Sequence, residues 1–363
     1  MLYFIVLTQR CNLKCIYCGN EPQEEYGPEN AEFSIEDLKK FISQDPEANI
    51  EFYGGEPLLN IPLMLKIMDE VPANHYMIQT NATILRRVPP EYLKRFDVIL
   101  ASIDGRPEIN DYYRGKGTYN RVLDNLRYAR SVGFKGDLIA RMAVSEHSSI
   151  YDEVIHLLSL DDPKFDHVHW QLDVEWSYPM ELTWKDFDGW VNNNYNPGIT
   201  KLIDFWISHM KKGEVLGIVP FQNIMQSLIT GEKAHLRCGS GIDSFTITTN
   251  GKITACPILP ANEISNLGDI RTTFYLDLPG KESIGEPCLS CDIYDICGGR
   301  CLYANKTKLW GEEGFLKVCK TVRHLINELK RVKPIVEELL NTQIIDKEDL
   351  FYPPYNNGCE IIP

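Results

Sequence analysis

Short runs of β-branched and aromatic residues alternate with amphipathic segments through the first 180 residues of the chain. The runs predict strands at 2–7, 49–53, 75–80, 96–103, 137–144 and 167–176, and the amphipathic segments predict helices at 34–44, 62–71, 90–95, 119–132 and 149–160. Strands that alternate with helices form parallel sheets with helical crossovers. Six such units predict an α/β fold: a partial (β/α)6, TIM-like barrel, shorter than the closed form of eight units.

The sixth predicted strand alternates most strictly. Its odd positions carry His167, His169, Gln171, Asp173 and Glu175, and its even positions carry Val168, Trp170, Leu172, Val174 and Trp176. One face of a barrel wall meets the helices and the other faces inward. The polar row therefore lines the barrel interior or, if this strand is the open edge, meets water, and the pattern leaves both alternatives open. If the row faces inward, Asp173 and Glu175 are the candidate substrate contacts, because they lie nearest the carboxyl end of the strand.

The texture changes after the barrel. Residues 183–231 read as helical, and the turn-rich stretch 236–320 carries seven cysteines. Asn250-Gly251 predicts a two-residue hairpin turn that pairs Thr249 with Lys252 and Phe245 with Cys256. A long helix at 315–340, kinked before Pro334, and a tail with Tyr352 follow. The predicted organisation is a barrel (1–216), a helical linker (217–235), a small cysteine-rich domain (236–325), and a C-terminal helix and tail (326–363).

Composition narrows the class of protein. The net charge of −14 argues against nucleic acid as a partner, because a phosphate backbone requires a basic face. The chain has no apolar run long enough to span a membrane, and its start lacks the features of a signal peptide. We therefore expect a cytoplasmic protein without a membrane partner. Eleven cysteines in a reducing compartment indicate metal binding and not disulfides.

Three cysteines lie within eight residues directly after the first predicted strand: Cys11, Cys15 and Cys18. We call them the loop set. Barrel active sites are built at this end of the strands. Three thiolates can hold three irons of a [4Fe–4S] cube and leave the fourth iron for a small ligand. A structural zinc site would need a fourth protein ligand, and no further His or Cys is close in the sequence.

The spacing Cys11-x3-Cys15-x2-Cys18, with Tyr17 before the last cysteine, resembles the signature of the radical S-adenosylmethionine (radical SAM) enzymes. The resemblance implies that the amino and carboxylate groups of SAM chelate the open iron. It also implies that reduction of the cluster releases a 5′-deoxyadenosyl radical, which abstracts a hydrogen atom.

Further segments resemble the barrel motifs of that family, in the same order. The resemblance places several residues at the SAM site. They come from the cysteine loop, the GGEP segment after strand two, the QTNAT segment of strand three and the end of strand four: Tyr17, Gly54, Gly55, Glu56, Pro57, Gln79, Thr80, Asn81, Ser102 and Asp104. The loop after strand four, including Arg114, also resembles the family. Arg141 on strand five could pair with a carboxylate, such as that of SAM, or could be a surface arginine.

The later cysteines follow the pattern Cys238-x12-Gly251-x4-Cys256, then Cys288-x2-Cys291-x5-Cys297-x3-Cys301, then Cys319. This pattern resembles the seven-cysteine SPASM domain of peptide-modifying radical SAM enzymes. The resemblance implies two auxiliary [4Fe–4S] clusters, and hence three clusters in all. One would be held by an outer set, Cys288, Cys291, Cys297 and Cys319, and one by an inner set nearer the barrel, Cys238, Cys256 and Cys301.

The inner set is one thiolate short of four. Cys359 in the tail could complete it, the fourth iron could stay open for a substrate thiolate, or Cys359 could be an unrelated free thiol. We favour the last alternative, because a cysteine in a tail is more often a free thiol than a cluster ligand.

The resemblance implies a peptide or protein substrate and a low-potential electron donor such as flavodoxin or ferredoxin. We expect hydrogen abstraction from a peptide residue followed by crosslinking, with a thioether favoured, or by another oxidative change. Sulfatase maturation to formylglycine is an alternative, but that group often has Asp where this chain has Pro257 and Gln where it has Tyr53. An iron–sulfur electron carrier is the alternative outside the enzymes.

Overall fold

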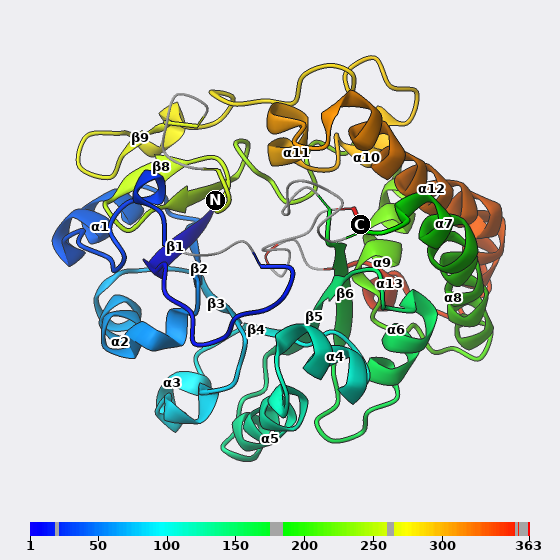
Figure 1. The fold of residues 1–363 in the computed structure, drawn as a ribbon, viewed down its shortest axis with the longest axis horizontal. Helices are drawn as coiled ribbons and strands as arrows, with labels where there is room; N and C mark the ends of the chain where they lie inside the picture. The colour runs from blue at the N-terminus through cyan, green and yellow to red at the C-terminus, as the bar shows by residue number, and fades with distance from the viewer. Residues whose placement is uncertain (19–21, 175–183, 260–264, 353–354, 356–361) are drawn as a thin grey trace.

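The computed structural model describes residues 1–363 except 19–21, 175–183, 260–264, 353–354 and 356–361. Its centre is one curved sheet with the strand order β6-β5-β4-β3-β2-β1-β7-β8-β9 (Figure 1). The six predicted strands pair in parallel, which confirms the partial barrel. The strands are β1 (Leu2–Thr8), β2 (Asn49–Gly54), β3 (His75–Thr80), β4 (Val98–Ser102), β5 (Asp137–Val144), β6 (His167–Leu172), β7 (Ser244–Ile247), β8 (Lys252–Thr254) and β9 (Gly268–Asp269).

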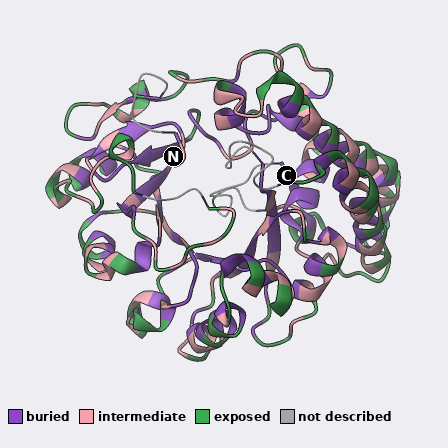
Figure 2. Ribbon diagram, viewed as in Figure 1, coloured by how far each residue is buried: buried purple, intermediate pink, exposed green. Residues whose placement is uncertain are grey.

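Helices surround the outside of the parallel strands, and their buried faces turn toward the sheet (Figures 1 and 2). All five predicted barrel helices form; a helix in the loop after β4, here α4, was not predicted. The barrel helices are α1 (Ile35–Ile42), α2 (Ile61–Glu70), α3 (Pro90–Leu93), α4 (Pro107–Arg114), α5 (Thr118–Ser131) and α6 (Ile150–Leu158). Later helices are α7 (Phe187–Trp190), α8 (Asn196–Met210), α9 (Val219–Thr230), α10 (Tyr294–Cys297), α11 (Leu302–Thr307), α12 (Gly311–Asn341) and α13 (Lys347–Leu350).

Helix α1 illustrates how the sequence forms this outer layer. The Ser34 hydroxyl accepts a hydrogen bond from the Asp37 backbone N–H, and so caps the first turn. Leu38, Phe41 and Ile42 share one face at helical spacing and are fully buried. The cap and the apolar stripe together fix where the helix begins and which face meets the sheet.

The cysteine-rich segment continues the barrel sheet. Strand β7 pairs in parallel with β1, with Leu2 opposite Ser244 and Ile5 opposite Ile247. This hairpin therefore shares the backbone hydrogen bonds of the barrel, a connection that the sequence did not predict. Of the described helices, none is long and apolar enough to cross a membrane.

The predicted hairpin register is wrong by one residue. Ile247 pairs with Ile253, and the Thr248 N–H donates to the Lys252 carbonyl at 2.9 Å. A two-residue type I′ turn needs positive φ at both central residues, but here φ is positive at Gly251 (82°) and not at Asn250. The connection is instead a three-residue loop with glycine at its left-handed position, which shifts every pair of the predicted ladder.

The C-terminal helices pack on the side of the barrel where β6 lies. Helix α12 is unbroken at Pro334, begins earlier than predicted, and packs on α8 and α9 (Figure 1). After it, the Tyr352 side chain lies in an apolar cluster with inward-facing residues of the strands, including Met77, Leu100 and Ile139. The Tyr352 ring therefore fills part of the barrel interior.

Candidate active site

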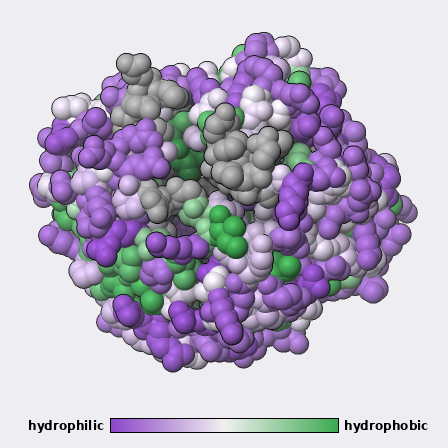
Figure 3. Space-filling model, in the orientation of Figure 1, coloured by the Kyte–Doolittle hydropathy of each residue, from purple (hydrophilic) through white to green (hydrophobic). Residues whose placement is uncertain are grey.

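A cavity of about 530 Å³ lies at the carboxyl ends of the barrel strands. Figure 3 shows the face of the molecule seen in Figure 1, which is hollowed near its centre. Residues of the loop set, of strands β3 to β6 and of the cysteine-rich segment all line the cavity. The loop set and the inner set therefore line the same cavity, although they are more than 200 residues apart in the sequence. The cysteines that line it are Cys11, Cys15, Cys18, Cys238, Cys256 and Cys301.

Backbone and side-chain hydrogen bonds position the cysteine loop. The Ile16 N–H donates to the Tyr113 carbonyl at 2.9 Å, and the Cys18 N–H donates to the Cys15 carbonyl at 3.0 Å. The Asn81 amide donates to the Asn12 side chain at 2.9 Å and approaches the Cys11 sulfur at 3.7 Å. These bonds fix the loop between the ends of β1 and β3 and the unpredicted helix α4.

A buried ion pair between Asp104 and Arg114 holds the cysteine loop through Tyr17. Asp104 is fully buried, and Arg114 donates to both of its carboxylate oxygens at 2.8 Å. The Tyr17 hydroxyl donates to the same carboxylate at 2.6 Å, and the Ala143 N–H donates at 2.9 Å. These partners occupy the Asp104 oxygens and Asp104 does not line the cavity, so the carboxylate supports Tyr17, and its contact with SAM stays a prediction.

The GGEP segment brings the end of β2 against the start of the cysteine loop. The Gly55 N–H donates to the Thr8 carbonyl at 2.9 Å, and a Cβ at Gly55 would lie 2.3 Å from the Arg10 carbonyl oxygen. Gly54 has a φ of 145°, and a Cβ there would lie 2.2 Å from the Thr8 carbonyl oxygen. Glycine is required here because two backbones meet with no room for a side chain. Both glycines line the cavity, as the predicted SAM site requires.

The other two residues of this segment do not line the cavity. Glu56 is fully buried and accepts hydrogen bonds from the Thr80 hydroxyl at 2.7 Å and from the Leu58 and Asn81 N–H groups. Burial raises the pKa of Glu56 to about 7. Pro57 begins a buried 3-10 turn. Glu56 therefore holds the end of β3 against the end of β2, and the contact of both residues with SAM stays a prediction.

The remaining predicted SAM contacts do line the cavity: Tyr17, Gln79, Thr80, Asn81, Ser102 and Arg141. Arg141 is 6% exposed, so the surface alternative is wrong, and its guanidinium donates to the Gln171 Oε1 at 2.6 Å. Ser102 lies opposite Arg141 in the β4–β5 ladder. The Gln79 Oε1 is buried and accepts no hydrogen bond from the described residues.

Strand β6 is shorter than predicted and ends at Leu172. Its apolar row packs in the core, and Gln171 and Asp173 line the cavity, so the inward orientation of the polar row is confirmed. Asp173 is 2% exposed; its Oδ2 accepts from the Ser145 hydroxyl at 3.0 Å, and its Oδ1 has no partner among the described residues. Burial raises its pKa to about 7. Glu175 lies outside the described residues.

The later cysteines separate into the two predicted sets. Within the inner set, the neighbouring Cys301 and Cys238 sulfurs contribute, after burial, to raising the pKa of Cys256. Within the outer set, Cys297, Cys288 and Cys291 contribute to raising the pKa of Cys319. Each set is thus a local cluster of thiols, and only the inner set lines the cavity.

The donor chemistry fits iron–sulfur clusters. All ten cysteines in the described ranges are free thiols. Burial raises the pKa of Cys15 to about 11, so this thiol is neutral until a metal displaces its proton. No group of three or more His, Cys, Asp or Glu among those ranges is placed to share one metal ion, so the zinc alternative has no support there. A [4Fe–4S] cube instead takes one thiolate on each iron.

Some cavity residues carry no sequence signal that we recognised. Gln9 is buried, and its amide donates to the Gly27 carbonyl at 2.5 Å. The Tyr26 hydroxyl donates to the Ile258 carbonyl at 3.2 Å, which ties the segment after the cysteine loop to the inner set. Ser240 lies two residues after Cys238, and their side chains are 3.2 Å apart. Only Ser240 could have been suspected, from its spacing to a predicted ligand.

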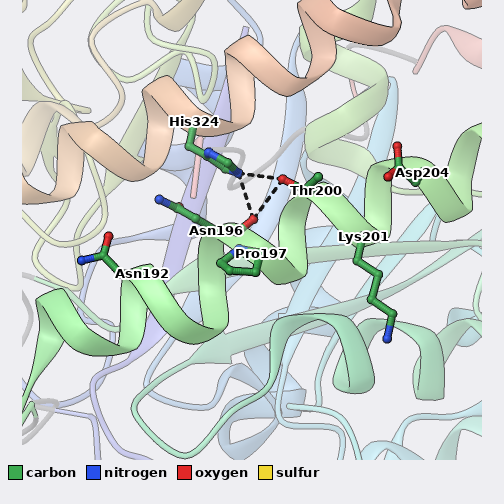
Figure 4. Close-up of a pocket in the computed structure, with 7 residues that line it drawn as sticks. All are labelled: Asn192, Asn196, Pro197, Thr200, Lys201, Asp204 and His324. Carbon is green, nitrogen blue, oxygen red and sulfur yellow. Dashed lines mark hydrogen bonds between the residues drawn. The ribbon is translucent and has the colours of Figure 1, made fainter.

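A second, open cavity of about 580 Å³ lies between α8 and α12, outside the barrel. Figure 4 shows the His324 ring at its edge, 2.8 Å from the Asn196 carbonyl and 3.0 Å from the Thr200 hydroxyl. None of the predicted site residues lines it. The predicted chemistry-bearing residues gather instead in the first cavity.

Residues 5–148 match the sequence model of the Radical SAM superfamily. The chain is 25% identical over 325 residues to the mycofactocin maturase MftC of Mycobacterium tuberculosis, which covers 82% of this chain and 77% of that protein. It is 21% identical over 334 residues to the cysteine-type anaerobic sulfatase-maturating enzyme of Clostridium perfringens, which covers 82% and 87%.

The solved structure of native anSMEcpe with bound AdoMet has the same fold. It superposes with a TM-score of 0.73 at 17% identity and covers 94% of this chain and 100% of that one. The cysteine loop, the glycine-lined cavity and the matched segment all lie in the same barrel. Residues 5–148 therefore form a radical SAM domain, which implies a [4Fe–4S] cluster and SAM as cofactors, and the maturase relatives indicate that the chain is an enzyme.

Proposed function

We propose that this enzyme modifies a peptide or protein substrate by abstracting a hydrogen atom from one residue, followed by crosslinking or another oxidative change. One observation carries the proposal: the loop set and the inner set line a single cavity. A substrate residue in that cavity would meet both thiol groups at once. The proposal includes three [4Fe–4S] clusters, held by the loop, inner and outer sets.

The residues of the barrel have distinct roles in the proposal. When bound, the loop cluster and SAM supply a 5′-deoxyadenosyl radical. Gly54 and Gly55 let the end of β2 pack directly against the start of the cysteine loop at the cavity wall, and Arg141, held by Gln171, offers a cation to the SAM carboxylate. Asp173 offers one carboxyl oxygen to a hydrogen-bond donor of the substrate, since its other oxygen is held by Ser145.

Among the reactions open to this enzyme, we favour thioether formation. The inner set supplies three thiols, so a cluster bound there would have one iron without a ligand from that set. Because these thiols line the cavity, a cysteine of the substrate could approach that iron from the cavity. The assignment of residues 236–325 as a SPASM domain belongs to this proposal, as does the question of Cys359, which lies outside the described residues.

The relatives support a peptide or protein substrate. MftC is named as a maturase of mycofactocin, and the Clostridium enzyme as one that matures sulfatases. Formylglycine formation is the second candidate, favoured by the high coverage of the sulfatase-maturating enzyme. Pro257 and Tyr53, which replace residues typical of that group, both line the cavity. We therefore place this candidate behind crosslinking.

The first test uses SAM alone. Protein reconstituted with iron and sulfide and then reduced should convert SAM to 5′-deoxyadenosine and methionine, and the variant Cys15→Ala should not. Fully loaded protein that forms no 5′-deoxyadenosine would favour the electron-carrier alternative. Flavodoxin or ferredoxin is the proposed physiological donor, and each can replace the chemical reductant in the same assay.

The second test identifies the substrate. Candidate peptides carrying deuterium at single positions are incubated with the reduced enzyme, and the 5′-deoxyadenosine is analysed by mass spectrometry. Deuterium in the product identifies both the peptide and the position attacked. A mass loss of two hydrogens with loss of the free cysteine thiol would support a thioether, whereas conversion of cysteine to formylglycine would support the alternative.

A further inference from the structure

Two polar side chains donate hydrogen bonds to sulfurs of the outer set. The Arg323 guanidinium on α12 lies 3.2 Å from the Cys291 sulfur, and the Asn305 amide on α11 lies 3.5 Å from the Cys288 sulfur. Neither residue lines the cavity, and the radical chemistry uses neither. They therefore act on the outer set and not on SAM or the substrate.

Both donors are held in place by further bonds. Arg323 also donates to the Asp292 carboxylate at 3.0 Å, so its guanidinium bridges two consecutive residues of the cysteine-rich segment. The Asn305 side chain accepts from the Gly285 N–H at 2.8 Å and donates to the Gly285 carbonyl at 3.1 Å. The orientation of each donor toward its sulfur is thus fixed by the fold.

Two further arginines approach the same set. Arg237 donates to the Ile296 carbonyl, directly before Cys297, at 2.6 Å. The Arg300 guanidinium acts as a nearby cation on Cys297 and Cys319. At the inner set, the side-chain contact between Cys238 and Ser240, at 3.2 Å, is with a neutral hydroxyl. Arginines therefore approach the outer set from several positions, and Asp292, which pairs with Arg323, is an acidic group beside the Cys291 sulfur.

We infer that Arg323 and Asn305 are positioning residues that raise the reduction potential of a cluster bound by the outer set. This inference rests on the ligand sets of the proposed function. A cluster gains negative charge when it is reduced, so hydrogen bonds to its sulfurs and nearby cations stabilise the reduced form. Arg323 contributes both effects and should dominate. Asn305 contributes the hydrogen bond alone.

The test is a redox titration followed by electron paramagnetic resonance. It uses the full chain with Cys11→Ala, Cys15→Ala and Cys18→Ala, which removes the loop cluster and leaves the signals of the auxiliary clusters. In this background, Arg323→Leu should lower the midpoint of one auxiliary cluster and leave the other unchanged. Arg323→Lys, which keeps the charge, should restore part of the shift, and Asn305→Asp should lower the same midpoint.

Arg331→Leu is the matched control. Arg331 lies two turns further along α12 and pairs with Asp204 and Glu328 on the surface, so its removal should leave both midpoints unchanged. Equal midpoints in Arg323→Leu and the parent, at equal iron content, would overturn the inference. Iron content is measured on every variant, so a lost cluster is not mistaken for a shifted one.

The outcomes separate this inference from the proposed function. If the parent protein binds no iron beyond the loop set, the ligand assignment and the inference both fail. If the auxiliary clusters form and shift as described but the complete enzyme makes no 5′-deoxyadenosine, the proposed function fails and the inference stands.

Discussion

The Tyr17 hydroxyl lies 2.6 Å from the buried carboxylate of Asp104, 87 residues further along the chain. Arg114 neutralises that carboxylate from the opposite side and lies over the Tyr17 ring, 5.5 Å from its centroid. The conformation of the cysteine loop therefore depends on an ion pair whose two residues are not among the predicted cluster ligands. This dependence can be tested on the metal-free protein.

Arg114→Met should lower the free energy of unfolding by about 3–5 kcal/mol, because it leaves the Asp104 charge buried without its cation. Tyr17→Phe removes one hydrogen bond to a charged group and should cost only about 1.5–3 kcal/mol. Urea unfolding of the metal-free protein measures both. Arg127→Met, at an exposed pair with Asp124, is the control and should change stability by less than about 1 kcal/mol. Similar effects in all three variants would contradict the role of the buried pair.

Gly55→Ala should impair cluster loading more than overall stability. The added Cβ would lie 2.3 Å from the Arg10 carbonyl oxygen, so the cysteine loop must move away from β2. We expect the loop cluster to be lost while the auxiliary clusters remain. Iron content and absorbance should therefore fall when Gly55→Ala is made in the parent protein, and should not change when it is made in the variant that lacks Cys11, Cys15 and Cys18. Gly285→Ala is the control, because its nearest neighbour would lie 3.5 Å away. Normal loading in Gly55→Ala would contradict the close approach.

Asp173 should make the protein less stable as the pH rises from about 4 to about 7. Its pKa is raised to about 7 in the folded state by burial, so in this interval the folded state binds the proton more tightly than the unfolded state does. The stabilisation is complete below the unfolded pKa and is lost as the pH passes the folded one. Asp173→Asn should flatten this part of the urea-unfolding profile, whereas the exposed Asp161→Asn should not. Parallel profiles for parent and Asp173→Asn would contradict the shift.

Tyr352→Ala should cost about 3–5 kcal/mol, because the ring is 4% exposed and fills part of the barrel interior. Tyr355 stacks on His75 at 3.9 Å but is 36% exposed, so Tyr355→Ala should cost much less. Chemical denaturation of both variants measures the difference. Equal losses would mean that the tail contributes only through surface contacts.

Iron content should follow the three cysteine sets. The parent should bind about twelve irons per chain, and replacement of Cys11, Cys15 and Cys18 by alanine should remove about four. Replacement of Cys288 and Cys291 should remove about four others and leave 5′-deoxyadenosine formation detectable. Cys359→Ala tests the remaining alternative: unchanged iron content and auxiliary spectra would exclude this thiol as a ligand of the inner cluster.

The sequence predicted the barrel because each of its strands and helices has its own periodic pattern. The alternation along β6 left two orientations for its polar row, facing the barrel interior or facing water. In the structure Asp173 lines the cavity, which is the inward orientation. The grouping of the later thiols was implied by the resemblance to the SPASM pattern and not by spacing alone, since Cys301 joins Cys238 and Cys256 from more than 40 residues away. The predictions for the barrel and for β6 concern features that are encoded within short stretches of chain.

Contacts between distant segments were not predictable in the same way. No local pattern indicates that β7 pairs with β1, because the partners are more than 200 residues apart. Motif membership placed Glu56 and Asp104 at the SAM site, but it does not determine which side chains turn toward a cavity and which bind the backbone behind it. The hairpin register failed because Asn-Gly is compatible with more than one loop length.

The pairing of β7 with β1 has a further consequence. Cys11 follows one of these strands and Cys256 follows the hairpin that begins with the other, so a continuous backbone ladder sets the gap between the two thiol groups. A ladder of this kind cannot widen without breaking several hydrogen bonds together. The fold therefore fixes the width of the gap. We expect the gap to exclude substrate residues with large side chains by size alone, whatever their reactivity.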